Sequence, residues 1–273
     1  MGTTFRLTFF ASSATQADQV AALVFERINY LNLIFSDYLT TSEINGLADK
    51  AGQKVKVSDD LWHLIKVSKK VSKRSKGAFD VTVGPLTKLW RHAIRQQQFP
   101  DSTRLNQALQ LVNYRWIKLY PATQSIKLKK PGMKLDFGAI AKGYAVDQAY
   151  QVLKKQGIPI ALVDGGGDLF VGDPPPQPQT WSIKDHKGRH IKVPAHSAVA
   201  SSGDSYKFLS WNGKRYSHIV DPGTAIGIEE SEIVTVTAQS ATIADALAST
   251  CSILTEKHRK KLLKKYRARL LKP

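Results

Sequence analysis

The apolar residues of this chain recur at two periods, and each period predicts a kind of element. Between residues 15 and 35 the apolar positions Val20, Val24 and Ile28 fall on one face, because they repeat at the spacing of an α-helix. Similar spacing behind a capping residue or a small residue predicts four more helices. The five helices begin at Thr15, at Ser58 or Asp59, at Asp101-Ser102, at Ala139 and at Ala241.

Short segments rich in β-branched and aromatic residues predict strands between and after these helices. They lie at residues 5–10, 115–120, 125–130, 160–163, 168–171, 181–184, 191–194, 197–201, 216–220 and 233–237. Their order is mixed, with hairpins in place of a regular alternation of strand and helix. We therefore expect an α+β fold of antiparallel sheets with packed helices, and not a doubly wound parallel sheet.

Residues 257–273 differ from the rest of the chain, because they contain nine Lys or Arg and no acidic residue. Leu262, Leu263, Tyr266 and Leu270 recur there at helical spacing, which predicts a basic amphipathic helix. We divide the chain into a body, residues 1–256, and this tail. The apolar stripe favours packing on the body, whereas the charge also suits an anionic membrane surface, a nucleic acid or an acidic partner.

Composition narrows the class of protein further. Lys and Arg number 40 against 22 Asp and Glu in 273 residues, a formal net charge of +18. The single cysteine, Cys251, excludes an internal disulfide and a thiolate zinc site. No apolar run reaches the roughly eighteen residues that a membrane-spanning helix requires. We see no secretory leader, so we expect a cytoplasmic protein if the chain is complete, and a periplasmic or inner-membrane-associated one if a leader has been removed.

Glycines and charged residues gather in three segments where a scaffold alone would not require them. Phe79 and Asp80 lie between glycines, an arrangement that suits a flat polar ring approached closely by the backbone. Lys142 stands in the first turn of a helix, where a cation and free N–H groups can hold phosphate. Asp164 and Asp168 flank three glycines between two strands, which is typical of a close backbone approach or of a tight hairpin.

Two further segments carry groups that titrate or bind cations. His218 and Asp221 stand near the end of one predicted strand, where a structural role is equally compatible with the residue types. Asp245 lies in an otherwise small and apolar helix, with Ser249 one turn later on the same face. A buried carboxylate requires a cation, and oxygen ligands of this kind suit Mg²⁺, which also binds substrate phosphates.

Taken in order, these motifs resemble those of the ApbE family of FAD:protein FMN transferases. The resemblance covers the chain up to the basic tail. Because the tail is the segment suited to nucleic acid and it lies outside the motifs, we do not expect a nucleic-acid partner. The resemblance rests on residues 1–3, 38–43, 77–80, 136–145, 165–168, 202–204, 218–222 and 244–247.

The resemblance implies a specific reaction. The family holds FAD in a central cleft and uses Mg²⁺ to split its pyrophosphate. FMN passes through a phosphoester bond to a Thr or Ser hydroxyl of an acceptor flavoprotein, and AMP is released. The alternative is an FAD-binding protein, or a Mg²⁺-dependent FAD pyrophosphatase, that transfers nothing to protein.

The resemblance also implies roles for individual residues. Positions that match flavin or nucleotide contacts are Met1, Tyr38, Ala78, Phe79, Asp80, Asp136, Lys142, His218 and Ile219. Ala139, through its carbonyl, Asp245 and Ser249 match the metal ligands. A carboxylate or imidazole must accept the proton of the acceptor hydroxyl, and the candidates are His218, Asp221 and Asp245.

The sequence departs from the family pattern at two points. Asp164 stands where the family usually has Asn before its glycines, which adds a negative charge. After Asp221-Pro222 the family usually continues with Arg or Lys, Thr and Gly, whereas this chain has Gly223-Thr224-Ala225. The second departure bears on the conformation of this loop and on its role toward the acceptor.

Overall fold

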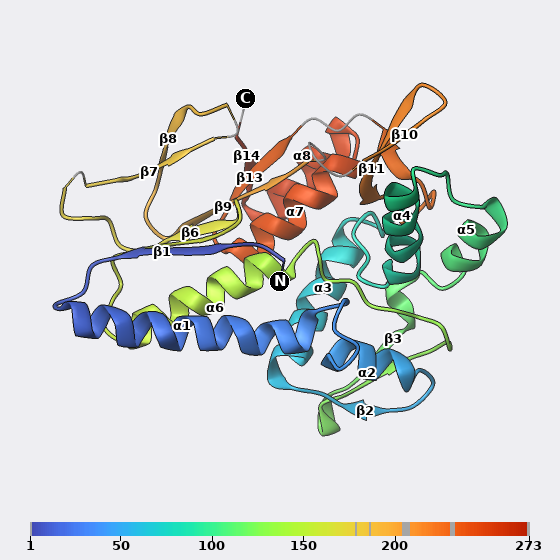
Figure 1. The fold of residues 1–273 in the computed structure, drawn as a ribbon, viewed down its shortest axis with the longest axis horizontal. Coiled ribbons are helices and arrows are strands. Elements are labelled where there is room, and N and C mark those ends of the chain that lie inside the picture. The colour runs from blue at the N-terminus through green and yellow to red at the C-terminus, as the bar shows by residue number, and fades with distance from the viewer. Residues whose placement is uncertain (1, 178, 186, 204–207, 230–232, 272–273) are drawn as a thin grey trace.

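A computed structural model describes residues 2–177, 179–185, 187–203, 208–229 and 233–271 of the chain. Its helices pack against one large and several small sheets (Figure 1). The α-helices are α1 (Ala14–Phe35), α2 (Glu43–Asp49), α3 (Asp59–Arg74), α4 (Gly84–Gln96), α5 (Ser102–Leu109), α6 (Ala141–Lys155), α7 (Ala241–Ile253) and α8 (Glu256–Tyr266). The strands are β1 (Phe5–Phe9), β2 (Val55–Lys56), β3 (Ile117–Tyr120), β4 (Ser125–Leu128), β5 (Ala161–Gly165), β6 (Leu169–Val171), β7 (Trp181–Lys184), β8 (His190–Val193), β9 (Ser197–Ser202), β10 (Phe208–Trp211), β11 (Lys214–Val220), β12 (Gly227–Glu229), β13 (Val234–Ala238) and β14 (Arg269–Leu270). The expected α+β class with antiparallel sheets is confirmed.

The largest sheet has six strands in the order β1-β5-β6-β9-β13-β14, and all its neighbours are antiparallel. One face packs against α6 and α7, and α1 packs on α6 (Figure 1). Side chains alternate between the faces as the pleat requires: Val163 of β5 joins the helix-side core, and Leu162 packs with the opposite core. On that opposite side the β7–β8 hairpin contributes Trp181 and Val193.

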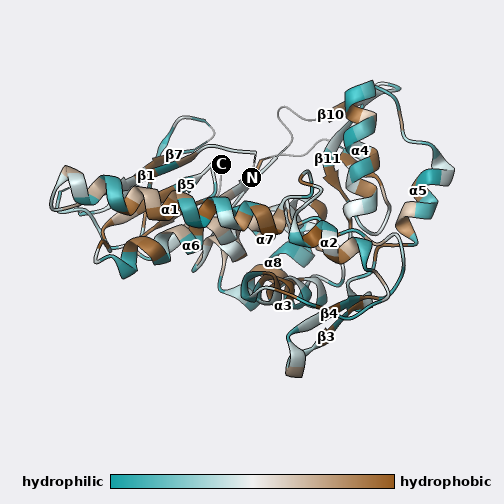
Figure 2. Cartoon of the chain, turned by 60° about the horizontal axis from the view of Figure 1, so that its bottom comes forward, coloured by the Kyte–Doolittle hydropathy of each residue, from teal (hydrophilic) through white to brown (hydrophobic). Residues whose placement is uncertain are grey.

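Two further cores complete the molecule. The end of α1 packs with α2, α3 and the sheet β2-β4-β3 in one of them, and α4 and α5 pack on the sheet β10-β11-β12 in the other. Figure 2 shows hydrophobic and hydrophilic residues alternating along α1 and α4, as helices with one buried side require. In the described part of the chain, no helix combines the length and the hydropathy that crossing a bilayer demands.

Helix caps explain most of the starts that the pattern predicts. Ser58 Oγ accepts from the N–H of Leu61, and Asp101 Oδ1 accepts from the N–H of Arg104, so each cap satisfies an N–H that has no partner in its helix. The helix predicted from Ala139 begins two positions later, at Ala141. Helices α2 and α4 are not predicted by the apolar pattern. In α4 the Gly-Pro pair that resembles a turn is the helix start, because proline suits the first helical turn.

The tail belongs to the fold, and the helix predicted through Leu270 is wrong beyond Tyr266. Arg267 takes a left-handed conformation with a φ of 52° and ends α8. Strand β14 then pairs with β13, because the sheet edge offers hydrogen-bond partners that a longer helix would not reach. Leu262 and Leu263 are buried in the main core. The apolar stripe therefore packs on the body, while a boundary at residue 256 stays a prediction.

Candidate functional site

An ammonium group lies between two buried carboxylates at the start of α6. Lys142 places Nζ 2.5 Å from Oδ2 of Asp168 and 3.3 Å from Oδ1 of Asp245. The two carboxylate side chains are 2% and 4% exposed, and that of the lysine is 30% exposed. Burial lowers the pKa of Lys142, but the two carboxylates outweigh it and raise that pKa above its ordinary value. With both carboxylates ionised the cluster is anionic, so it attracts a further cation.

The close approach of α6 and α7 places Asp245 in this cluster. A Cβ at Gly143 would lie 2.1 Å from the carbonyl oxygen of Ala241, so a larger residue would push the helices apart. The N–H of Gly143 donates to Oδ2 of Asp245 at 3.0 Å. Asp147 accepts from the N–H groups of Ala241 and Thr242 at 2.8 and 2.9 Å and so caps α7. A glycine and a cap thus hold the two helices in register.

Asp168 enters the cluster from the turn between β5 and β6. The N–H of Gly165 donates to the carbonyl of Asp168 at 2.8 Å, and the N–H of Gly167 donates to Asp164 Oδ1 at 2.8 Å. Gly167 has a φ of 94°, which glycine adopts without strain. Burial, with a contribution from the charge of Asp245, raises the pKa of Asp168 to about 7. The glycine-rich turn is therefore a tight turn that also delivers a carboxylate to the site.

A second cluster repeats this arrangement with an arginine. Arg91 of α4 forms ion pairs with Asp37 and with Asp136, whose Oδ2 lies 2.6 Å from Nη2. Asp136 Oδ2 also accepts from Thr87 Oγ1 at 2.7 Å. The guanidinium of Arg91 lies 4.8 Å from the ring centroid of Tyr38, and Tyr38 is 73% exposed. Two of the predicted flavin contacts, Tyr38 and Asp136, thus meet around Arg91.

The loop between Asp136 and α6 joins the two clusters. The N–H of Gly138 donates to Asp136 Oδ1 at 2.7 Å, and the N–H of Asp136 donates to the carbonyl of Val81 at 2.8 Å. Ala139, whose carbonyl is a predicted metal ligand, lies half-buried in this loop. A single segment therefore runs from the arginine cluster to the first turn that carries Lys142.

The segment around Asp80 packs against this loop, because the carbonyl of Val81 accepts from the N–H of Asp136. Asp80 Oδ1 accepts from the N–H and the hydroxyl of Thr82 at 2.8 and 2.7 Å, and Oδ2 accepts from the N–H of Tyr114 at 2.7 Å. Burial raises the pKa of Asp80. Phe79 is buried in the core, and Ala78 is half-buried. The structure thus gives Asp80 a structural role, and the contact of these three residues with flavin stays a prediction.

The remaining candidates from the sequence lie on or after β11. His218 and Ile219 are half-buried in that strand, and Asp221 follows it and accepts from a backbone N–H in the next turn at 2.8 Å. Strand β11 packs on α4, where the rings of Trp90 and Tyr216 lie 5.8 Å apart. The structure therefore places these candidates next to the helix that carries the arginine cluster.

The donors available for Mg²⁺ are of mixed chemistry. Among the described residues, no three His, Cys, Asp or Glu side chains form a group that could hold a metal ion. Asp245 offers a buried carboxylate, Ser249 a hydroxyl one turn later, and Ala139 a backbone carbonyl. Mg²⁺ is usually bound through one or two carboxylates and keeps water and substrate phosphates as its other ligands. The chemistry of these three donors therefore fits Mg²⁺, with water or a substrate phosphate as its other ligands.

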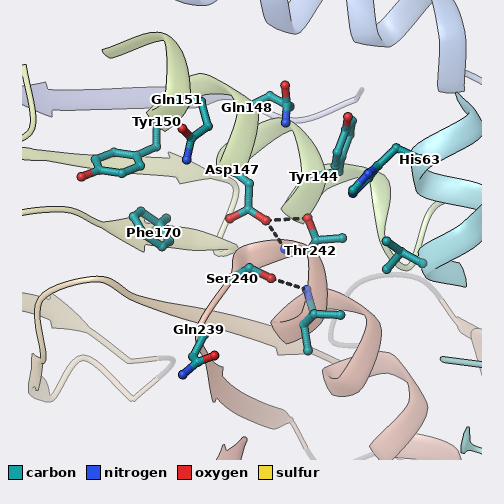
Figure 3. A pocket seen from close by; sticks show the side chains of 12 residues that line it. His63, Tyr144, Asp147, Gln148, Tyr150, Gln151, Phe170, Gln239, Ser240 and Thr242 are labelled. Carbon is teal, nitrogen blue, oxygen red and sulfur yellow. Dashed lines mark hydrogen bonds between the residues drawn. The ribbon is translucent and has the colours of Figure 1, made fainter. Parts of the chain in front are cut away.

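A cavity of about 320 Å³ lies where α3, α6 and α7 meet (Figure 3). None of the described residues predicted for the site lines it. Several of its polar lining residues cap the N-terminus of α7. Asp147 accepts from the N–H of Thr242, and Ser240 Oγ accepts from the N–H of Ile243 at 3.3 Å. The ring of His63 stacks on that of Tyr144, with the centroids 5.7 Å apart. These contacts give the cavity a structural explanation.

Arg91 and Asp168 belong to the two clusters, but no role for either follows from the sequence. Thr87 and Arg91 stand one turn apart on the same face of α4. That spacing is the sequence feature that could have indicated a polar cluster there. Asp168 ends the glycine-rich motif at residues 165–168. The residues around it do not show that its carboxylate faces Lys142, which stands 26 positions earlier. Met1, predicted at the flavin, lies outside the described residues.

Known proteins resemble this chain in both sequence and fold. The model of the ApbE family matches residues 1–271. A relative from Treponema pallidum, named FAD:protein FMN transferase, is 31% identical over 93% of this chain and 76% of its own length. The crystal structure of the ApbE protein from Thermotoga maritima has a TM-score of 0.87 at 28% identity, and covers 98% of this chain and 91% of its own. The apo flavinyl transferase ApbE from Pseudomonas stutzeri has a TM-score of 0.86 at 25% identity, and covers 99% and 88%.

The family match extends past the point where the motifs in the sequence end, and it includes α8 and β14. The matched structures cover nearly the whole of this chain, so the match includes the helices and sheets that carry both cation clusters. The chain belongs to the ApbE family.

Proposed function

We propose that this protein transfers FMN from FAD to a Thr or Ser hydroxyl of an acceptor flavoprotein, with Mg²⁺ as its metal and AMP as the second product. Relatives named FAD:protein FMN transferase support the reaction class. The observation that carries the proposal is the pair Lys142 and Asp245 at the junction of α6 and α7. It sets a cation suited to phosphate beside a carboxylate suited to a divalent metal.

Phosphoryl transfer depends chiefly on positioning and on neutralising charge, and the residues around α6 supply both. The ammonium of Lys142, 30% exposed at its side chain, binds a phosphate of FAD. The carboxylate of Asp245, the hydroxyl of Ser249 and the carbonyl of Ala139 hold Mg²⁺. When bound, the metal supplies positive charge that offsets the charge of the pyrophosphate.

The transfer forms one bond and breaks another at the phosphorus of the FMN moiety. The acceptor hydroxyl oxygen bonds to that phosphorus, the bond from phosphorus to the bridging oxygen breaks, and AMP leaves with that oxygen. The hydroxyl proton must pass to a base. Asp245 is already assigned to the metal, so we assign proton acceptance to His218 or Asp221, at the end of β11.

The flavin side of the site lies at the arginine cluster. Tyr38 presents an exposed ring beside Arg91, and an exposed aromatic ring is a surface on which an isoalloxazine or adenine ring can stack. Asp136, held by Arg91 and Thr87, lies next to it as an acceptor for polar ring edges.

One incubation tests the proposal and its alternative together. The purified protein, FAD, Mg²⁺ and an ApbE-type acceptor flavoprotein are mixed, and the denatured acceptor is examined by mass spectrometry and by its flavin fluorescence. The expected result is an acceptor whose mass has increased by FMN, with AMP released in equal amount. AMP together with free FMN, and no flavin on the acceptor, would instead establish a pyrophosphatase and contradict the transfer.

A further inference from the structure

Two carboxylates compete for one ammonium at the start of α6. Nζ of Lys142 lies 2.5 Å from Asp168 and 3.3 Å from Asp245, so the lysine is held mainly by Asp168. The oxygens of Asp245 differ in use: Oδ2 accepts from the N–H of Gly143, and Oδ1 is the one that faces the lysine. Oδ1 is therefore the oxygen whose availability depends on where the ammonium lies.

The position of Asp168 is fixed independently of the lysine. Its backbone carbonyl accepts from Gly165 inside the turn, and the next residue, Leu169, pairs with Asp164 and Val199 in the middle of the six-stranded sheet. A carboxylate fixed in this way holds a flexible lysine side chain at a set place, because the lysine ammonium gains a short charge-assisted hydrogen bond there.

We propose that Asp168 is a positioning residue that draws the Lys142 ammonium toward itself, so that its contact with Asp245 Oδ1 stays long enough for Mg²⁺ to take that oxygen. This inference rests on the proposed function. Without the carboxylate of Asp168 the ammonium moves onto Asp245, and a metal ion then has to displace it. Breaking a buried ion pair is costly, so the metal binds less tightly although its own ligands are unchanged.

The test is a calorimetric titration of Mg²⁺ into the full-length protein in the absence of FAD, so that the readout is metal affinity and not turnover. Four proteins form a cycle: the wild type, Asp168→Asn, Lys142→Met and the double variant. Asp164→Asn is the matched control, because it removes the same charge from the same turn, where Asp164 accepts from Gly167. Thermal denaturation of each variant verifies that it is folded.

We expect Asp168→Asn to weaken Mg²⁺ binding about tenfold, and Asp164→Asn to change it less than about twofold. In the Lys142→Met background the Asp168→Asn change should have less than about a twofold effect, because no ammonium remains to be misplaced. An equal loss in both backgrounds would show that Asp168 acts only through its charge, and unchanged binding in folded Asp168→Asn would also overturn the inference. If the wild-type protein bound no Mg²⁺, the metal of the proposed function would be contradicted as well. The two preceding outcomes would overturn only the role of Asp168.

Discussion

At the scale of single residues, the site consists of two cations that each hold two carboxylates together. Lys142 lies between Asp168 and Asp245, and Arg91 lies between Asp37 and Asp136. Partly buried charges are costly unless they are paired, so each cation stabilises carboxylates that would otherwise oppose folding. When its carboxylates are ionised, each cluster carries one more negative than positive group, which leaves it suited to a further cation or donor.

The metal role of Asp245 leads to the first prediction. Asp245→Asn keeps the size of the side chain and an oxygen that can accept from Gly143, but it removes the charge that attracts Mg²⁺. FMN transfer at limiting Mg²⁺ should fall by about a hundredfold or more, while FAD binding, followed by quenching of flavin fluorescence, survives at least in part. Transfer at the wild-type rate under these conditions would contradict the assignment of Asp245 as a metal ligand.

The second prediction concerns stability and pH at Asp168, whose pKa is raised from an ordinary 3.8 to about 7. Between these values the folded protein binds a proton at Asp168 that the unfolded chain has released, so this group destabilises the fold as pH rises. Asp168→Asn lacks that titration. Relative to wild type, its free energy of unfolding should therefore rise by about 1–2 kcal/mol between about pH 5 and pH 8, as measured by urea denaturation. Parallel curves for the two proteins would refute the raised pKa.

The sequence predicts which segments carry functional side chains better than it predicts which of those side chains pair with one another. The segments that contain Lys142, Asp136 and Asp245 stand out by their glycines and charges, and the structure brings all of these segments into or next to the two clusters. Which cation meets which carboxylate could not be predicted, since Lys142 and Asp245 are 103 positions apart and Arg91 and Asp136 are 45 apart. Only the packing of α4 and α7 sets those distances.

At the scale of elements, the junction of α6 and α7 is the feature on which the site depends, and Gly143 is its tightest point. A Cβ there would lie 2.1 Å from the carbonyl oxygen of Ala241 and 2.9 Å from Cβ of Asp245. We predict that Gly143→Ala lowers the free energy of unfolding by about 3 kcal/mol, measured by urea denaturation, because the two helices must separate. The same separation should weaken Mg²⁺ binding.

Gly46→Ala is the matched control, because Gly46 also lies inside a helix, α2, and an added Cβ would meet nothing within 4 Å. Alanine favours a helix over glycine by about 0.5–1 kcal/mol, so this variant should be slightly more stable than wild type. If both variants were equally stable, the contact between α6 and α7 would be looser than the structure shows.

The elements differ in how far their sequences predict them, for physical reasons. Helices α1, α3 and α5 bury one regular face, so their apolar period is visible. Helices α6 and α7 are buried on most sides and are visible instead as runs of small and apolar residues. Helix α4 also has one regular buried face, at Leu86, Trp90 and Ala93, but its Gly-Pro start resembles a turn. Strand β14 could not be predicted locally, because its formation depends on the edge of β13, more than thirty positions earlier.

At the scale of the whole molecule, the formal net charge of +18 has its densest part on α8 and the end of α3. The two helices meet where Nη1 of Arg74 donates to the carbonyl of Lys265 at 3.2 Å, and the guanidinium of Arg74 lies 4.6 Å from the ring centroid of Tyr266. Since α8 is anchored by buried leucines, its exposed lysines form a fixed surface. A fixed basic surface can raise the rate of encounter with an acidic protein.

The last prediction tests whether this surface steers an acceptor flavoprotein. Changing three exposed lysines of α8, Lys257, Lys261 and Lys264, to Glu should lower kcat/KM for a whole acidic acceptor about tenfold at low salt, with transfer to a short acceptor peptide unchanged. The loss should shrink toward physiological ionic strength, where exposed charges more than about 8 Å apart are largely screened.

The matched control changes Lys50, Lys56 and Lys129 to Glu, because these exposed lysines lie on or beside α2, β2 and β4 and the change in total charge is identical. Steering by total charge would slow both triple variants alike, whereas steering by the surface of α8 slows only the first. Equal kcat/KM values for the two variants on the whole acceptor at low salt would therefore rule out a local role for α8. An effect of the α8 changes that persisted on the peptide would instead indicate damage to the core beneath the helix, where Leu262 and Leu263 are buried.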